Sequence, residues 1–95
     1  MIKISIKKDE IIINGHANYN DYGKDIVCAS VSSIAITTIN AIISFDNNSI
    51  DVLEKEGYLK IQILKHTKET DILISNMTDL FKELENKYPK NIKIN

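Results

Sequence analysis

The sequence predicts an α+β fold of two layers, in which two helices pack on one mainly antiparallel sheet. Short runs of alternating or β-branched apolar residues occur in pairs, separated by turn formers, as is typical of β-hairpins. Two longer segments carry apolar residues at spacings of three and four, as is typical of helices that cover a core. The runs follow one another in the order β-β-α-β-β-α-β, so we expect a single domain over residues 1–95.

The first hairpin is predicted at the start of the chain. In residues 2–7 isoleucine alternates with lysine or serine, the period-two pattern of a strand with one face on a core. Residues 8–10 form a polar turn, and the three isoleucines of residues 11–13 return as an antiparallel partner. This second strand ends close to Gly15, with His16 next in the chain.

A polar loop and a long helix follow. Residues 17–24 include Tyr19, Tyr22 and Gly23, a composition suited to a loop, and Asp25 is the predicted N-cap, which places Cys28 in the first helical turn. The helix carries an apolar stripe of Val27, Val31, Ile34, Ala35, Thr38, Ile39, Ile42 and Phe45. Further apolar residues leave it apolar nearly all round, so we expect burial on more than one side, with a second subunit as the other covering surface.

The second half repeats the arrangement. Residues 50–55 and 58–64 are predicted as strands joined at Glu56-Gly57, and Thr67 or Thr70 as the cap of an amphipathic helix that Pro89 stops. That helix has an apolar stripe of Leu73, Met77, Leu80, Phe81, Leu84 and Tyr88, and a water-facing side of Asp79, Lys82, Glu83, Glu85 and Lys87. Residues 91–95 alternate again and are predicted as a last short strand.

Composition narrows the class of function. A net charge of −1 and a pI near 6.1 offer no broad basic surface, which argues against nucleic-acid binding. The serines, threonines and asparagines of residues 26–45 argue against a membrane span. One cysteine fits a reducing compartment, so we expect a cytoplasmic protein, and the small size favours a homodimer. No metal-binding constellation and no phosphate-binding glycine loop is present, so we expect no cofactor.

The segment of residues 14–33 contains Cys28, the only cysteine, and His16, one of two histidines. A nearby imidazole and the positive end of a helix are the usual means of forming a thiolate at neutral pH, so this segment is a candidate cysteine-nucleophile site. The helix dipole contributes only about 0.3–1 kcal/mol at an exposed site, so His16 must supply most of the activation. The backbone amide of Cys28 or Ala29 is the natural candidate for an oxyanion donor.

Each of these residues also has a structural interpretation. A cysteine is often a small buried hydrophobic residue, and His16 can simply bond a loop backbone. Gly15 and Gly23 are expected where the backbone approaches another segment closely or adopts a positive φ. Ser32 lies one turn after Cys28, where a serine commonly bonds its own preceding turn. His66 lies among polar residues and is expected on the surface.

The same segment resembles the ribosomal-processing cysteine proteases called Prp. The resemblance rests on G-H-A at residues 15–17 and on Y-G-x-D-I-V-C-A at residues 22–29, followed by Ser32 and, more weakly, by N-A-I at residues 40–42. It covers about a third of the chain at the level of motifs. It implies a cysteine endopeptidase with Cys28 as nucleophile and His16 as general base and acid. The supporting residues that we take from the motif and its surroundings are Gly15, Ala17, Tyr22, Gly23, Asp25, Ala29 and Ser32.

The resemblance also implies a homodimer and a substrate loop after His16 that orders when peptide binds. Members of this family remove the short N-terminal extension of large-subunit ribosomal protein twenty-seven, cutting after a bulky aromatic residue, which is the substrate expected here. The main alternative is a non-catalytic dimeric adaptor that binds a ribosomal protein or peptide in the same groove. A thiol redox enzyme is a weaker alternative, since the chain contains no resolving cysteine.

Overall fold

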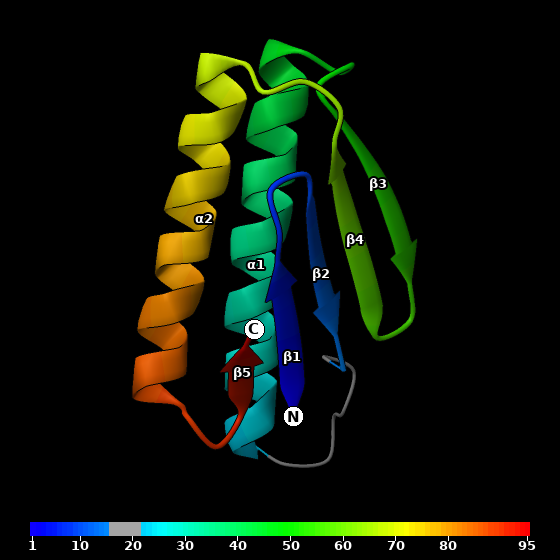
Figure 1. The fold of residues 1–95 in the computed structure, drawn as a ribbon. Coiled ribbons are helices and arrows are strands. Elements are labelled where there is room, and N and C mark those ends of the chain that lie inside the picture. Colours follow the sequence, from blue (N-terminus) through cyan, green and yellow to red (C-terminus); the bar gives the residue numbers. More distant parts are fainter. Residues whose placement is uncertain (16–21) are drawn as a thin grey trace.

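The computed structural model describes the backbone of residues 1–15 and 22–95, and the side chains of residues 1–15 and 26–95. Two helices lie side by side on one face of a five-stranded sheet (Figure 1). The strands are β1 (Ile2–Ile6), β2 (Glu10–Asn14), β3 (Ile50–Lys55), β4 (Tyr58–Ile63) and β5 (Ile92–Ile94). The helices are α1 (Tyr22–Phe45) and α2 (Lys68–Lys87). The predicted fold class and element order are confirmed.

The strands are arranged in the order β3-β4-β2-β1-β5. Both hairpins are antiparallel, and they join through an antiparallel pairing of β2 with β4, in which Asn14 lies opposite Tyr58. The last strand pairs with β1 in parallel, so the sheet is mainly antiparallel, as predicted. This order places β2 in the centre of the sheet, with β4 on one side and β1 on the other.

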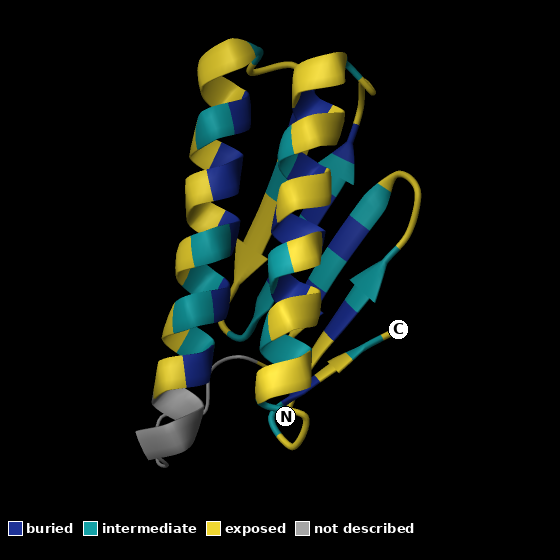
Figure 2. Ribbon diagram, turned by 90° about the vertical axis from the view of Figure 1, so that its left-hand side faces the viewer, coloured by how far each residue is buried: buried dark blue, intermediate teal, exposed yellow. Residues whose placement is uncertain are grey.

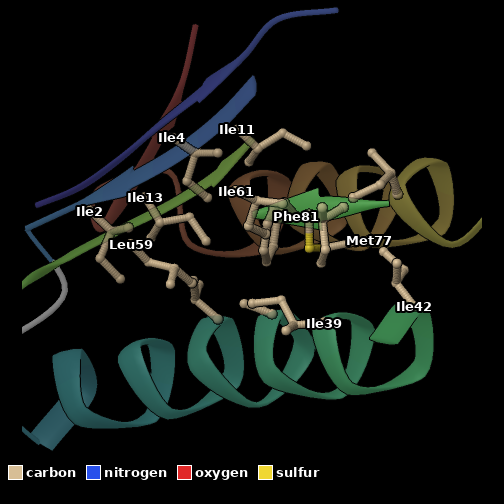
Figure 3. Close-up of a cluster of buried hydrophobic side chains, with 14 of the residues drawn as sticks. Ile2, Ile4, Ile11, Ile13, Ile39, Ile42, Leu59, Ile61, Met77 and Phe81 are labelled. Carbon is tan, nitrogen blue, oxygen red and sulfur yellow. The ribbon is translucent and has the colours of Figure 1, made fainter. Parts of the chain in front are cut away.

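The core lies between the sheet and the helices. Alternate strand residues point toward the helices, and they pack against apolar side chains of α1 and α2 (Figure 3). Ile4, Ile11 and Ile61 are fully buried on the sheet side, and Met77 and Phe81 are fully buried on α2. Burial of this apolar surface is the main stabilising contribution to folding, at about 25 cal/mol for each Å² removed from water.

The first helix is buried on one side only within the chain. Val27, Val31 and Ala35 of the predicted stripe are inaccessible to water, but Phe45, also predicted there, is 70% exposed. The exposed residues of α1 form a line along its outer surface (Figure 2). Within one chain, α2 and the sheet cover only one part of the helix circumference, so the expected burial of the other side by a second subunit stays a prediction.

The composition of α1 also passes a simple test for membrane-spanning helices. Residues Ile26–Phe45 have a mean hydropathy of 2.0, so this stretch is hydrophobic enough for a membrane span in spite of its serines, threonines and asparagines. One such helix is weak evidence for a membrane span, since the core helices of soluble proteins reach the same length and hydropathy. In this fold the inner side of α1 forms part of the core.

The second helix begins at a side-chain cap. The Thr67 hydroxyl accepts a hydrogen bond from the backbone N–H of Thr70 over 3.1 Å, which confirms the first of the two predicted caps. The helix ends at Lys87, just before Pro89, as expected. One residue predicted to face water differs: Glu85 is half-buried, and its Oε2 accepts from the N–H of Ile94 over 2.8 Å. Glu85 therefore ties β5 to α2.

Candidate active site

Cys28 lies near the start of α1, on the side that meets the core. Its neighbours Val27 and Val31 are buried, while Cys28 itself is half-buried and packs against the core cluster. It is the only cysteine in the sequence. A half-buried cysteine lies between the two interpretations, a reactive nucleophile and a small buried hydrophobic residue, because it contacts the core and also keeps a surface that a reagent can reach.

The start of α1 differs from the prediction. The helix begins at Tyr22, so Asp25 is its fourth residue and not its N-cap, and Cys28 falls in the second turn. Only N–H groups in the first turn of a helix lack an intrahelical partner, and Cys28 and Ala29 lie beyond that turn. The amides of Cys28 and Ala29 are consequently used within the helix, which removes them as oxyanion donors. The dipole effect also weakens beyond the first turn, so the helix contributes less to a thiolate than expected.

Gly15 lies one residue beyond the end of β2, the strand that leads to His16. Its φ is +87°, a conformation that side-chain-bearing residues rarely adopt. A Cβ at this position would lie 2.6 Å from the carbonyl oxygen of Met1, too close for any ordinary contact. Both reasons predicted for a glycine here are confirmed. Gly23 is different, since it is the second residue of α1, where the helical φ is negative.

Two predicted residues, His16 and Ala17, lie outside the described residues, and so do the side chains of Tyr22 and Asp25. The described chain does bring the flanking segments together, since the Gly15 end of β2 and the first turns of α1 lie at the same end of the molecule (Figure 1). Ala29 is exposed beside Cys28, and Ser32 is half-buried one turn further along, a spacing that places it on the same helical face as Cys28.

The second histidine lies at the opposite end of the molecule. His66 Nε2 is 2.6 Å from Asp9 Oδ1, and His66 Nδ1 is 2.8 Å from Asp71 Oδ1. The hydrogen bonds to Asp9 and then Asp71 raise the pKa of His66, because both carboxylates favour the imidazolium. The side chain is exposed, as predicted, but sequence reasoning missed both partners, since Asp9 is 57 residues away.

The separation of His66 from Cys28 follows from the helix length. Cys28 lies 18 residues before Asp46, which is about 27 Å along a helix axis. Asp46 Oδ2 is 3.5 Å from the Nζ of Lys65, the residue before His66. His66 therefore cannot reach Cys28 within one chain. In the described residues no group of three or more His, Cys, Asp or Glu side chains is arranged to hold a metal, and both His66 ring nitrogens already contact carboxylates.

Sequence reasoning also missed the contact that holds Gly15. The Gly15 N–H donates to the carbonyl oxygen of Gly57 over 2.8 Å. Gly57 has a φ of +72° and forms, with Glu56, the turn of the β3–β4 hairpin. The turn itself was visible in the sequence, but its place beside the end of β2 depends on the β2–β4 pairing, for which the sequence carried no local signal.

Comparison with known proteins identifies the family. Residues 1–93 match the family Peptidase_Prp, described as cysteine protease Prp. The ribosomal processing cysteine protease Prp of Mycoplasma genitalium is 31% identical over 97 residues, which cover 100% of this chain and 95% of that protein. Sequence similarity therefore extends far beyond the motifs around His16 and Cys28.

Solved structures agree with this match. The essential ribosomal processing protease Prp from S. aureus in complex with a substrate peptide superimposes with a TM-score of 0.87 at 26% identity, over 99% of this chain and 95% of that one. The same S. aureus protease with a covalently linked product peptide gives a TM-score of 0.83 at 27% identity, with the same coverage. A covalently linked peptide fits a thiol nucleophile and favours an enzyme over an adaptor. The chain belongs to the Prp family of cysteine proteases.

Proposed function

We propose that this protein is the endopeptidase that removes the N-terminal extension of large-subunit ribosomal protein twenty-seven, with Cys28 as nucleophile and His16 as general base and acid. One observation carries the assignment of the nucleophile. A cysteine protease requires a thiol, and the 95 residues contain a single cysteine. The position of Cys28 supports this, since it is half-buried near a helix start and retains accessible surface.

The assignment of the base rests on elimination. The chain contains two histidines, and His66 is bound between Asp9 and Asp71 at the far end of the molecule. His16 follows Gly15 directly in the chain, and Gly15 lies at the same end of the fold as the start of α1. Within one chain His16 is therefore the only histidine available to take the proton from the Cys28 thiol.

The reaction then proceeds by acyl transfer. His16 takes the thiol proton, and the Cys28 Sγ attacks the carbonyl carbon of the scissile peptide bond to give a tetrahedral oxyanion. When the intermediate collapses, the C–N bond breaks and His16 returns the proton to the departing amine, leaving a thioester on Cys28. Water, deprotonated by His16, then attacks the thioester to give a second tetrahedral intermediate. When this intermediate collapses, the carboxylate is released, and the proton held by His16 restores the Cys28 thiol.

The proposed substrate is supported by what the relatives are. The Mycoplasma genitalium relative is a ribosomal processing protease, and the S. aureus relative has been seen with a substrate peptide. A ribosomal protein precursor is thus the proposed substrate class, and the cut is proposed after an aromatic residue. The enzyme is proposed to act in the cytoplasm, where a single cysteine stays reduced.

The test uses a synthetic peptide that spans the extension and the first mature residues of the host's ribosomal protein twenty-seven. Mass spectrometry should find one cut, after an aromatic residue, with wild type and with His66→Gln, and none with Cys28→Ala or His16→Ala. His66→Gln is the matched control, because it removes the other histidine at a site remote from Cys28. Cleavage by Cys28→Ala would refute the nucleophile, and a bound but intact peptide with every variant would favour the adaptor.

We also propose that the enzyme is a homodimer that pairs through the exposed side of α1. This surface, the α1 seam, consists of Ile26, Ala29, Ser33, Ile36, Asn40 and Ile43. Its residues alternate at spacings of three and four, the pattern of a helix that packs along a partner helix, and none is charged. Ile26, Ile36 and Ile43 are 60%, 48% and 44% exposed in the isolated chain.

The order of residues along the α1 seam supports a second copy as its partner. An antiparallel pair related by a two-fold axis places Ile26 opposite Ile43, Ala29 opposite Asn40 and Ser33 opposite Ile36 of the other copy. Two of these three layers then combine a small residue with a larger one, and the third combines two isoleucines, so the helices can approach closely without a gap. The seam is thus complementary to itself.

A further inference from the structure

We propose that the turn at Gly57 positions the catalytic histidine, acting through the backbone of Gly15. This inference rests on the proposed role of His16. Gly15 is the last described residue before His16, and its carbonyl carbon is bonded to the His16 nitrogen. The direction in which the chain leaves β2 is therefore set at Gly15, and whatever holds Gly15 also sets the starting point of His16.

Two backbone carbonyls hold Gly15, one from each neighbouring strand. On the β4 side, the Gly57 oxygen accepts the Gly15 N–H over 2.8 Å. On the β1 side, the Met1 carbonyl oxygen occupies the space that a side chain at residue 15 would need, 2.6 Å from its Cβ. The strand order β4-β2-β1 puts these carbonyls on opposite flanks of the chain. Only a glycine at positive φ can pass between them.

Gly57 has the correct position because of the turn in which it lies. Tyr58 pairs with both Lys55 and Asn14, so the two-residue turn Glu56-Gly57 projects just beyond the end of the β2–β4 ladder. The Gly15–Gly57 hydrogen bond extends that ladder by one residue. Gly57 is the second of the two turn residues and adopts a φ of +72°, which favours glycine at this position, so its carbonyl direction is imposed by a tight hairpin.

This arrangement assigns Gly15 and Gly57 as positioning residues, because both would act on the general base through the backbone. A general base must lie within hydrogen-bond reach of the proton that it takes, and a misplacement of about 1 Å can reduce turnover about 100-fold. In the sequence, the sheet is the rigid element nearest to His16. A fixed backbone at Gly15 is therefore the support that the sheet can give to this residue.

The sharpest test deletes the Gly15 N–H without changing any side chain. The single cysteine provides a ligation site between Val27 and Cys28, so a synthetic segment of residues 1–27 can be joined to recombinant residues 28–95. Glycolic acid in place of Gly15 replaces the amide by an ester and deletes the N–H that donates to Gly57. The matched control is the corresponding ester at Lys7, whose N–H donates to Glu10 over 2.9 Å at the other end of the β1–β2 hairpin.

Two properties are measured on the refolded, full-length proteins: kcat and KM on the substrate peptide, and the pH dependence of Cys28 alkylation by iodoacetamide without substrate. We expect the Gly15 ester to lower kcat by about 10- to 100-fold with little change in KM. Its alkylation profile should shift toward that of His16→Ala. The Lys7 ester should match the unmodified ligated protein in both properties, although it loses a backbone hydrogen bond of similar length.

The outcomes separate this inference from the proposed function. If wild type and His16→Ala alkylate with the same pH profile, His16 does not activate Cys28 and the proposed mechanism fails. If those two differ but the Gly15 ester behaves as wild type, only the positioning role of Gly57 is refuted. Equal losses with both esters would also refute it, since the effect would then reflect general destabilisation. Gly15→Ala, monitored by circular dichroism, should show the same kcat loss in the fraction that folds.

Discussion

His66 shows how one residue can couple stability to pH without taking part in catalysis. Its imidazolium donates from both ring nitrogens, to Asp9 and to Asp71, whereas the neutral ring can donate from only one. The pKa of His66 is raised in the folded protein by these two hydrogen bonds, the one to Asp9 first. The stabilisation is therefore fully present below the unfolded pKa of about 6.5 and is lost as pH rises through the folded pKa.

The first prediction rests on the direction of this pH dependence of stability. His66→Gln should lower the melting temperature more at pH 5.5 than at pH 8.5, as measured by thermal unfolding followed by circular dichroism. Lys68→Gln, a nearby exposed charge change at the first residue of α2, should change the melting temperature by the same amount at both pH values. An equal effect of His66→Gln at the two pH values would show that its hydrogen bonds do not depend on the ring proton.

The proposed catalytic pair rests on signals within the chain itself. Cys28 and His16 are proposed from the sequence because a thiol and an imidazole are rare here and lie within one ordered motif. The role of Asp25 was wrong because capping residues are recognised by type, and an aspartate that could cap a helix can also lie within its first turn, as here. The contact of His66 with Asp9 could not be predicted, since a contact across 57 residues leaves no local pattern.

At the scale of elements, the cap of α2 has a measurable contribution. Thr67→Ala removes the hydroxyl that accepts the Thr70 N–H, so we expect a loss of about 0.5–2 kcal/mol in the free energy of unfolding. Urea titration at neutral pH measures this. Ser75→Ala, at an exposed position inside the same helix, is the matched control and should be near neutral. A loss of the same size at both positions would argue against a capping effect.

The second prediction for the elements concerns the proposed dimer through the α1 seam. Ile36→Glu places a charge opposite Ser33 of the proposed partner and should convert the dimer to a monomer at micromolar concentration, as measured by light scattering. Ile72→Glu is the matched control, because Ile72 is 57% exposed on α2, outside the seam. A wild-type monomer at that concentration would refute the dimer, and dissociation by Ile72→Glu alone would place the interface on α2.

For the whole molecule, one shared core predicts cooperative unfolding. Phe81 is fully buried between α2 and the sheet, so Phe81→Ala should cost about 3–5 kcal/mol, a large part of the stability of a domain of this size. Lys82→Ala, the exposed neighbour, should change little. Urea unfolding followed by circular dichroism and by tyrosine fluorescence should give one coincident transition for each variant. Two separate transitions would contradict the single domain expected from the sequence.

The order of helices and strands could be predicted because it depends on local periodicity. Alternation in residues 2–7 and spacings of three and four in residues 27–42 are properties of short windows, and the side chains that they placed inside are buried, apart from Ile6 and Ile34, which are half-buried. The exceptions lie at the ends: Phe45 is exposed at the last residue of α1, and Glu85 is drawn inward near the end of α2 by the backbone of β5. Side chains at the end of a helix depend on the course of the next segment of chain, which the periodicity of the helix does not report.

The neighbours of each strand were decided only by the three-dimensional packing. Nothing in residues 92–94 indicates a parallel partner, yet β5 pairs with β1 because α2 returns the chain to the free edge of that strand. The β2–β4 pairing likewise joins two hairpins across the long helix between them, and it brings Gly57 to Gly15. The proposed nucleophile could thus be chosen from the sequence as the only thiol, whereas the backbone around Gly15 is set by long-range pairing, because hydrogen bonds between distant strands form only when the core assembles.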